Sequence, residues 1–249
     1  MGQKYAIIET VDDTHRIGMV KEIFSTITGR YDLLNHVLSL RRDIAWRRFA
    51  VRRVCLYKTS RFLDVAAGTC DLAIEAAVHH PGIHVSGLDF AQPMLDQGRK
   101  KISARGLSGR IHLCRGDALR LPFSKDSFHA AGMAFGIRNI PDKHQALREL
   151  RRVVAPEGHV LILELSLPQS GWFRRFYDLY LNRLLPRIAG AISPNPAAYQ
   201  YLADSIMDFP SVTAFAGIMQ DAGWVDVRAY PLTLGICRLF VGRKPGGPS

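Results

Sequence analysis

The chain has 249 residues, of which 47% are hydrophobic and 22% are charged, so it can bury the core of one α/β domain. It contains no run of about 18 uncharged apolar residues, and residues 1–13 lack the pattern of a signal peptide, which argues against a membrane-spanning or secreted protein. The formal net charge of +11 favours an anionic partner, either nucleic acid or an acidic membrane surface. We therefore expect a cytoplasmic, single-domain protein over residues 1–249.

Much of the positive charge stands in adjacent arginine pairs. Exposed arginines need no partner, so solvated helix faces explain these pairs as well as a binding surface does. The pairs are Arg41 with Arg42, Arg47 with Arg48, Arg52 with Arg53, Arg151 with Arg152, and Arg174 with Arg175. The four cysteines form no CxxC motif or Cys/His cluster, which favours reduced thiols over a disulfide framework, and we expect no structural metal.

A basic helical region is expected over residues 20–54, ahead of an alternation of apolar runs and helical patterns between residues 61 and 244. This alternation is typical of a parallel sheet wound between helices. The last two runs are joined by residues 231–235, too few for a crossover helix, so they should pair antiparallel. The prediction is a seven-stranded sheet with one reversed strand, formed by residues 61–66, 84–89, 111–115, 129–135, 159–165, 225–230 and 236–242.

Helical patterns fill the intervals between the predicted strands. Pro141 and Asp142 open the third helix, and residues 156–158 form the turn into the fifth strand. A helical insertion over residues 171–201 interrupts the alternation after the fifth strand. The expected helices of the sheet core are residues 71–80, 93–104, 143–153 and 211–221.

The segment FLDVAAGTCDL (62–72) predicts a buried strand, a turn of small residues and a helix start, the place where open α/β sheets bind nucleotides. A dinucleotide fingerprint would need glycine at Ala66, Gly68 and Asp71, and two of these three fail. The Asp71 carboxylate would repel a pyrophosphate, whereas S-adenosylmethionine carries an ammonium and a sulfonium that Asp64 would attract. The charge pattern therefore favours S-adenosylmethionine.

Acids also follow the next two predicted strands. Asp89 ends the second strand, where a carboxylate can accept hydrogen bonds from both ribose hydroxyls, and Phe90 follows it into the site. Met94 is expected against the adenine, and Asp117 near the adenine edge, with the Ala118 amide as a donor beside it. Each acid could instead cap a helix. An acid after each of three successive strands nevertheless favours a methyltransferase.

Several separate runs stand in order along the chain: IFSTITGRYDLLNHVL (23–38), DVAAGTCDL (64–72), GDA (116–118), FGIRN (135–139), LELSLP (163–168), LPR (185–187) and YQYLADSI (199–206). From about residue 20 to residue 244 the chain thereby resembles the ubiquinone/menaquinone biosynthesis C-methyltransferase family, which methylates a ring carbon of a polyprenylated quinol. The resemblance implies a class I methyltransferase fold, a Rossmann-like α/β sheet.

The resemblance also implies which residues contact the cofactor. They are Thr69, Asp89, Asp117, Ala118 and Ala134. Ala134 stands where relatives often carry serine, so one side-chain hydrogen bond is absent. Cys70 stands where the family has the last glycine of the turn, and its thiol is expected to crowd the methionine part of the cofactor.

A hydroquinone ring becomes a carbon nucleophile when one hydroxyl loses its proton, so the enzyme needs help with deprotonation and a donor for the oxyanion. Arg138 is the first choice for the oxyanion, Asn139 for orienting the ring or a water, and Tyr31 for closing the site. The alternatives are that Arg138 pairs with an acid such as Asp142 and that Tyr31 belongs to the core. The general base is unassigned, since histidines 36, 129 and 144 are more often packing or surface residues.

The insertion carries apolar residues at helical spacing, which either complete the core or wall a channel for the isoprenoid chain. They are Trp172, Phe173, Phe176, Tyr177, Tyr180, Leu181, Leu184 and Leu185. A substrate in the bilayer would give the arginine pairs a use in peripheral docking to anionic lipid at the inner face of the membrane.

Two rival functions remain at this stage. One is a methyltransferase for another substrate, such as RNA or a small aromatic; the run at 135–139 lacks the Asn-Pro-Pro-aromatic motif, so no nucleic acid partner is expected. The other is a non-catalytic quinone-binding relative in which Cys70 and Ala134 have eroded cofactor binding. Demethylmenaquinol is the preferred substrate, while the ring type, the tail length and a homodimeric state are left open.

Overall fold

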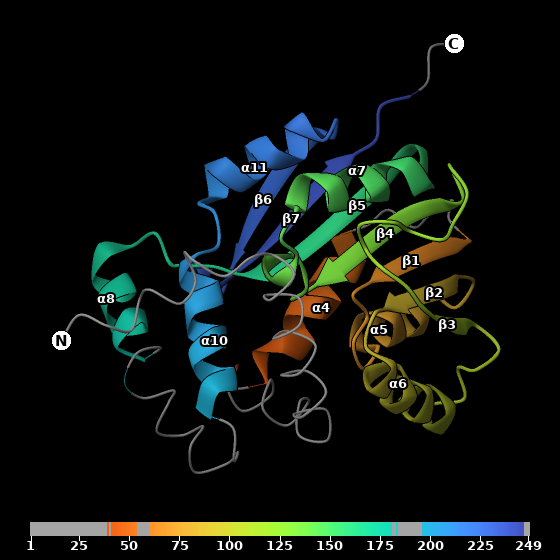
Figure 1. Ribbon diagram of the computed structural model, residues 1–249, viewed down its shortest axis with the longest axis horizontal. Helices are drawn as coiled ribbons and strands as arrows, with labels where there is room; N and C mark the ends of the chain where they lie inside the picture. Colours follow the sequence, from red (N-terminus) through yellow and green to blue (C-terminus); the bar gives the residue numbers. More distant parts are fainter. Residues whose placement is uncertain (1–38, 40, 54–59, 181–182, 184–195, 247–249) are drawn as a thin grey trace.

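The computed structural model describes residues 39, 41–53, 60–180, 183 and 196–246. Its centre is a seven-stranded sheet with the order β3-β2-β1-β4-β5-β7-β6 (Figure 1). Strands β1 to β5 pair in parallel, and β7 is antiparallel to both of its neighbours. The prediction of one reversed strand is confirmed. The strands are β1 (Arg61–Val65), β2 (His84–Asp89), β3 (Ile111–Arg115), β4 (Phe128–Ala134), β5 (Val154–Leu165), β6 (Val225–Leu232) and β7 (Cys237–Arg243).

Helices cover both faces of the sheet (Figure 1). On one face lie α4 (Arg42–Arg53), α5 (Asp71–His79) and α6 (Gln92–Ala104), and on the other lie α7 (Lys143–Val153) and α11 (Val212–Asp221). The inner strands β1, β4 and β7 are therefore buried almost continuously, whereas the edge strand β6 alternates between half-buried and exposed residues. The four helices predicted for the sheet core end within one residue of their predicted bounds.

Strand β5 differs from its prediction, because it begins at Val154 rather than at residue 159. Val154 pairs with Phe128, and the pairing then shifts so that His159 faces Ala130. Residues 156–158 form a bulge inside the strand rather than a turn before it. Glu157 has a φ of 64°, and a Cβ at Gly158 would lie 2.5 Å from the carbonyl oxygen of His129, so only glycine fits there.

Two hydrophobic clusters lie on opposite faces of the sheet. Phe62 and Ile74 belong to the cluster under α4 and α5, and Phe215 and Trp224 belong to the cluster under α7 and α11. The Trp224 indole is fully buried and donates to the carbonyl oxygen of Leu147 at 3.1 Å, so its one polar atom is satisfied. Burying each such aromatic side chain stabilises the fold by about 2–3 kcal/mol.

The predicted N-terminal helical region and the insertion are described only in part. Of residues 20–54 the structure describes α4, and Tyr31 lies outside the described residues. Of the insertion it describes α8 (Gly171–Leu179) and α10 (Pro196–Met207), which extends beyond the predicted end at residue 201. Both helices lie on the side toward which the parallel strands point (Figure 1), and Tyr177 packs with Ile206 near the end of β5.

Candidate active site

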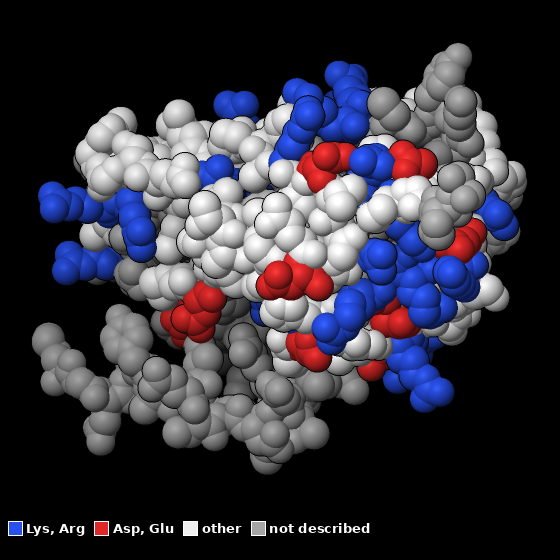
Figure 2. Space-filling model, turned by 90° about the horizontal axis from the view of Figure 1, so that it is seen from above, with Lys and Arg blue, Asp and Glu red and all other residues white. Residues whose placement is uncertain are grey.

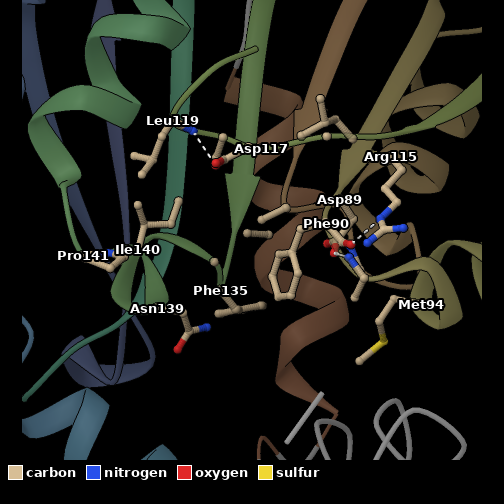
Figure 3. A pocket seen from close by; sticks show the side chains of 18 residues that line it. Asp89, Phe90, Met94, Arg115, Asp117, Leu119, Phe135, Asn139, Ile140 and Pro141 are labelled. Carbon is tan, nitrogen blue, oxygen red and sulfur yellow. Dashed lines mark hydrogen bonds between the residues drawn. The ribbon is translucent and has the colours of Figure 1, made fainter. Parts of the chain in front are cut away.

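A cavity of about 250 Å³ opens at the carboxyl ends of β1, β2, β3 and β4 (Figure 3). This edge of an open parallel sheet is where α/β proteins bind nucleotides. Most of the predicted site residues line it, and Asp64, Thr69 and Arg138 do not. The lining includes the predicted Ala66, Gly68, Asp89, Phe90, Met94, Asp117, Ala118, Ala134 and Asn139.

Asp89 is the buried acid of this cavity. Its Oδ2 accepts the backbone N–H of Gly68, and its Oδ1 accepts that of Ala91, both at 2.8 Å. These bonds fix the carboxylate, and each oxygen keeps a second lone pair for a ligand hydroxyl. Burial raises the pKa of Asp89, and the two backbone hydrogen bonds oppose that rise.

Asp117 lies at the exposed rim of the cavity, after β3. Its Oδ1 accepts the N–H of Leu119 at 2.9 Å, which closes a turn. Neither Asp89 nor Asp117 caps a helix, since α6 begins after Ala91 without a side-chain cap. The helix-cap alternative is therefore wrong for both acids, and their positions leave them available to a ligand in the cavity.

Asp64 does act at a helix start. It is 1% exposed, and its Oδ2 accepts the N–H of Ala73 in the first turn of α5 at 2.9 Å. Its other oxygen, Oδ1, is buried and has no hydrogen-bond partner in the described part of the chain. Burial raises the pKa of Asp64 to about 8, although the Arg47 charge lowers it. A buried acceptor without a donor fits a cationic group that would complete it.

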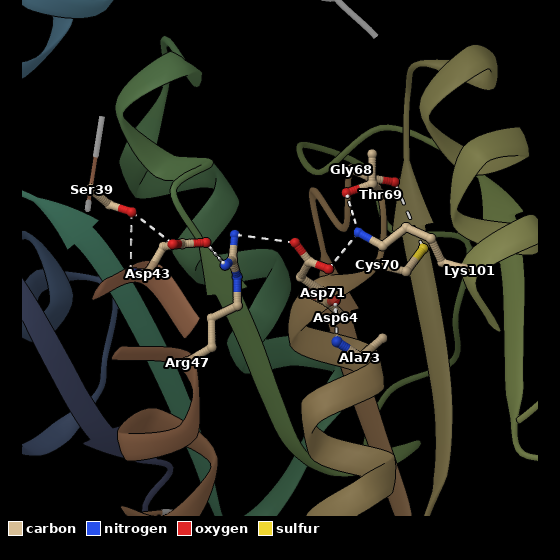
Figure 4. Close-up of polar contacts among 10 residues, drawn as sticks. All are labelled: Ser39, Asp43, Arg47, Asp64, Gly68, Thr69, Cys70, Asp71, Ala73 and Lys101. Carbon is tan, nitrogen blue, oxygen red and sulfur yellow. Dashed lines mark hydrogen bonds and ion pairs between the residues drawn. The ribbon is translucent and has the colours of Figure 1, made fainter. Parts of the chain in front are cut away.

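Asp71 belongs to a chain of ionic contacts that starts in α4 (Figure 4). Its carboxylate lies 2.5 Å from Lys101 and 3.7 Å from Arg47, and Arg47 also pairs with Asp43 at 2.6 Å. Lys101 donates to the Thr69 hydroxyl at 3.1 Å, so this hydroxyl is engaged outside the cavity. Lys101 and Arg47 offset part of the Asp71 charge, so the expectation that this carboxylate repels a pyrophosphate stays a prediction.

Arg138 lies behind the cavity wall, in the short helix η3 (Ile137–Asn139). Its Nη1 pairs with Glu164 Oε1 at 2.5 Å and donates to the carbonyl oxygen of Phe135 at 2.7 Å. Its acidic partner is thus Glu164 rather than Asp142, which instead caps α7 by accepting the N–H of Gln145 at 2.8 Å. The oxyanion role of Arg138 stays a prediction.

Asn139 lines the cavity and contacts α10. Its Oδ1 accepts a hydrogen bond from the Tyr201 hydroxyl at 3.0 Å. Tyr201 is absent from the predicted site, although it lies in the run 199–206 that carries part of the family resemblance. The contact therefore brings the FGIRN run and the Tyr-rich run together at the cavity wall.

Comparison with known proteins assigns the family. The model of the ubiE/COQ5 methyltransferase family matches residues 9–244. The chain belongs to this family. The family resemblance, the methyltransferase class and the fold expected from the sequence are thus confirmed.

Individual relatives are similar over most of their length. The chain is 41% identical to ubiquinone/menaquinone biosynthesis C-methyltransferase UbiE of Geotalea daltonii, over 90% of this chain and 96% of that protein. It is 44% identical to demethylmenaquinone methyltransferase of Thermus thermophilus, over 90% and 100%. Its fold is similar to that of phosphoethanolamine N-methyltransferase 2 of Haemonchus contortus in complex with S-adenosyl-L-methionine, with a TM-score of 0.55 at 17% identity, over 75% of this chain and 49% of that longer one.

Cys70, the departure from the family pattern, does not line the cavity. Its φ is 68°, the left-handed region that glycine adopts most easily, which explains the glycine of the family at this position. The buried thiol points toward α6, where a Cβ at Gly98 would collide with its Sγ. The expected crowding of the cofactor is therefore wrong. Burial raises the pKa of this thiol, which stays neutral.

The remaining lining of the cavity is mostly apolar and carries no chemical signal in the sequence. It consists of Leu88, Ala91, Arg115, Gly116, Leu119, Phe135, Gly136, Ile140 and Pro141. Arg115 ends β3, and its Nε donates to the carbonyl oxygen of Phe90 at 3.1 Å. Neither His129 nor His144 lines the cavity, and His36 lies outside the described residues, so the general base stays unassigned.

Proposed function

We propose that this protein is an S-adenosylmethionine-dependent enzyme that methylates a ring carbon of a polyprenylated quinol in menaquinone or ubiquinone biosynthesis, with demethylmenaquinol as its substrate. The observation that carries the proposal is the contact between Asn139 and Tyr201, which joins two family runs at the wall of the cavity. The names of the relatives, identical at 41% and 44% of positions, support the same reaction.

The residues around the cavity fit S-adenosylmethionine, which supplies an electrophilic methyl group when bound. Asp89 holds the ribose hydroxyls with the lone pairs that Gly68 and Ala91 leave, and Asp117 holds the adenine edge. A bound cation would favour the ionised form of Asp64 behind the turn, whereas a pyrophosphate would disfavour it, so this acid favours a cation over a dinucleotide. Phe90 and Met94 provide apolar contacts for the base.

The acceptor ring needs a donor for its developing oxyanion and a dry, shaped wall. The Asn139 amide oxygen accepts from Tyr201, so the Nδ2 group serves as the donor toward the cavity. Arg138 and Glu164 lie directly behind this wall as a buried ion pair. A guanidinium there stabilises negative charge on the ring oxygen through its field.

The direct test is methyl transfer from labelled S-adenosylmethionine to a short-chain prenyl-1,4-naphthoquinol kept reduced with dithionite. We expect a product methylated on the ring carbon, and none from the oxidised quinone, because only the hydroquinone can lose a proton to become nucleophilic. A benzoquinol run in parallel identifies the ring. Cells lacking the protein should accumulate the demethylated quinone, and an unchanged quinone profile would contradict the proposal.

Peripheral contact with an anionic membrane is the second part of the proposal. Within the described residues no helix is long and apolar enough to cross a membrane. Trp172 in α8 is 68% exposed beside the exposed Arg174 and Arg175, and basic side chains project at the end of the molecule where α8 lies (Figure 2). An exposed indole with neighbouring guanidinium groups suits the interface of an acidic bilayer.

Two of the five arginine pairs are less suited to this docking than the pair in α8. Arg47 is buried and paired with Asp43, and Arg152 pairs with Glu149 at 2.8 Å. We expect flotation with acidic liposomes at low salt, reduced by the W172A/R174Q/R175Q variant, since each arginine near the surface contributes up to ~1 kcal/mol. R148Q, an exposed arginine of α7, is the control, and equal flotation of all three proteins would exclude α8 as the contact.

A further inference from the structure

Arg238 is the second residue of the reversed strand β7 and lies at the carboxyl edge of the sheet. It is 4% exposed and pairs in register with Glu164 of β5. The next step of the ladder joins Leu239 to Leu163, and Leu163 is in turn the neighbour of Ala134 in the cavity wall. Arg238 therefore lies two strands from the cavity, about 10 Å across the sheet at the usual strand spacing.

The Arg238 guanidinium has no acceptor in the part of the chain that the structure describes. Its Nε is buried without a hydrogen-bond partner, and no described acid lies within ion-pair distance. Glu164, its neighbour in the ladder, is engaged by Arg138. A poorly solvated guanidinium without an acceptor is unfavourable, so such a group persists where a ligand or water completes it.

The position of the side-chain head indicates where this ligand would lie. A Cβ at Gly235 would be 3.2 Å from Arg238 Nη2 and 3.6 Å from the Pro168 Cα. The guanidinium thus lies between the β6–β7 connection and the loop that leaves β5 toward α8. Both segments border the space beyond the strand ends, next to the packing of α8 against α10.

A second buried group at this edge is also incomplete, and it is an acid. Asp64 in β1 keeps an unpartnered oxygen, while Arg238 in β7 keeps an unpartnered nitrogen, with β4 and β5 between them. The proposed reaction joins a cationic methyl donor to an acceptor that carries ring oxygens. The acid suits the donor, and the guanidinium suits an oxygen of the acceptor.

We infer that Arg238 binds a ring oxygen of the quinol acceptor and thereby places the ring against the methyl donor. This inference rests on the proposed function and adds a substrate-binding residue outside the runs that carry the family resemblance. Because a guanidinium prefers an anionic oxygen, Arg238 binds the deprotonated quinol more tightly than the neutral quinone.

The test compares R238M, which keeps most of the volume without the charge, with R151M. Arg151 is the matched control because its Nε is also buried without an acceptor, but it lies on α7 beside Gly223, far from the cavity. We expect R238M to raise the KM for dithionite-reduced prenyl-1,4-naphthoquinol about tenfold or more, with the Kd for S-adenosylmethionine unchanged by calorimetry. R151M should leave both constants unchanged.

The melting temperature distinguishes a ligand-binding role of Arg238 from a structural role, because the two roles predict opposite changes in Tm. R238M should raise the Tm, because it removes an unpaired buried charge, whereas a structural arginine would lower it. R238K, which keeps the charge but loses the planar fork, should give an intermediate KM and substitutes for R238M if that variant does not fold. If the wild type turns over the quinol and the variants have an unchanged KM, the inference about Arg238 is overturned and the proposed function stands. If the wild type shows no turnover, both the proposed function and the inference are rejected.

Discussion

At the scale of single residues, the site is built from acids whose surroundings differ sharply. Asp117 is exposed, Asp89 is buried with both oxygens bound to backbone amides, and Asp64 is buried with one oxygen unpartnered. The same residue type therefore provides an exposed carboxylate at the rim, a carboxylate fixed by backbone amides, and a buried acid with a raised pKa. These differences come from burial and from backbone donors, neither of which the one-letter sequence shows.

Asp64 should make stability depend on pH. Its pKa is about 8 in the folded protein and near 3.9 when unfolded, so the folded state holds an extra proton between these values. Stability from this group is complete below about pH 4 and is lost as the pH rises toward 8, by up to about 1.4 kcal/mol per pH unit. In urea unfolding without cofactor, D64N should lack this slope. Parallel curves for D64N and the wild type would refute the assignment.

Arg138 needs a test that separates chemistry from folding. R138A leaves Glu164 buried without its partner, and we expect it to cost about 3–5 kcal/mol of stability. The double variant R138M/E164M removes both charges and should recover most of that loss, while quinol turnover stays low and the Kd for S-adenosylmethionine stays near the wild-type value. Turnover near the wild-type rate in the stable double variant would remove Arg138 from the mechanism.

At the scale of elements, the turn between β1 and α5 packs against α6 through the thiol of Cys70. Cys70 adopts a left-handed conformation and directs its Sγ at Gly98, where a Cβ would collide with it. A small residue is thus needed on the helix because a larger one stands in the turn. The contact between Cys70 and Gly98 explains how the fold accommodates a cysteine where the family has glycine. From the sequence alone, this cysteine is expected to disturb the cofactor site.

The contact between Cys70 and Gly98 predicts that G98A changes stability in opposite directions in the wild type and in a C70A background. G98A in the wild type should destabilise the protein by about 1–3 kcal/mol through overpacking. In a C70A background, where the Sγ is gone, the same change should stabilise by up to about 1 kcal/mol, because alanine is the better helix former. Urea unfolding of the four proteins measures the coupling, and additive effects would show that the two positions do not touch.

At the scale of the whole molecule, distant parts of the chain close around the sheet. The Trp46 indole of α4 donates to Thr233 Oγ1 at 2.9 Å, between positions 187 residues apart. The same indole lies against Phe135 of the cavity wall, with ring centroids 6.2 Å apart. Helix α4 is thereby tied both to the β6–β7 connection and to the site.

Removing the Thr233 hydroxyl should therefore lower the free energy of unfolding of the whole protein. T233V leaves the buried indole N–H without its acceptor, and we expect a loss of about 1–3 kcal/mol in the free energy of unfolding. W46F removes the donor as well, so T233V should cost much less in the W46F background. An equal cost in both backgrounds would show that the hydrogen bond contributes nothing to stability.

Local sequence determined the strands, the helices of the core and the reversal of the last strand. Apolar runs and turn residues act over a few positions, and the connection at 231–235 is too short for a crossover, so these features are readable without tertiary contacts. The ordered acids Asp89 and Asp117 were likewise predicted, because strand ends of a parallel sheet converge on one edge.

Only the tertiary structure decided how the charges pair and where the thiol points. Asp71 pairs with Lys101 and Arg47, Arg138 pairs with Glu164, and Tyr201 reaches Asn139 from a helix 62 positions away. Such contacts join residues that are distant in the chain, and their strength depends on burial, which no local pattern reports. The sequence by itself therefore determined the family, the sheet and most of the cavity, and the fold decided which of its charges remain available for a ligand.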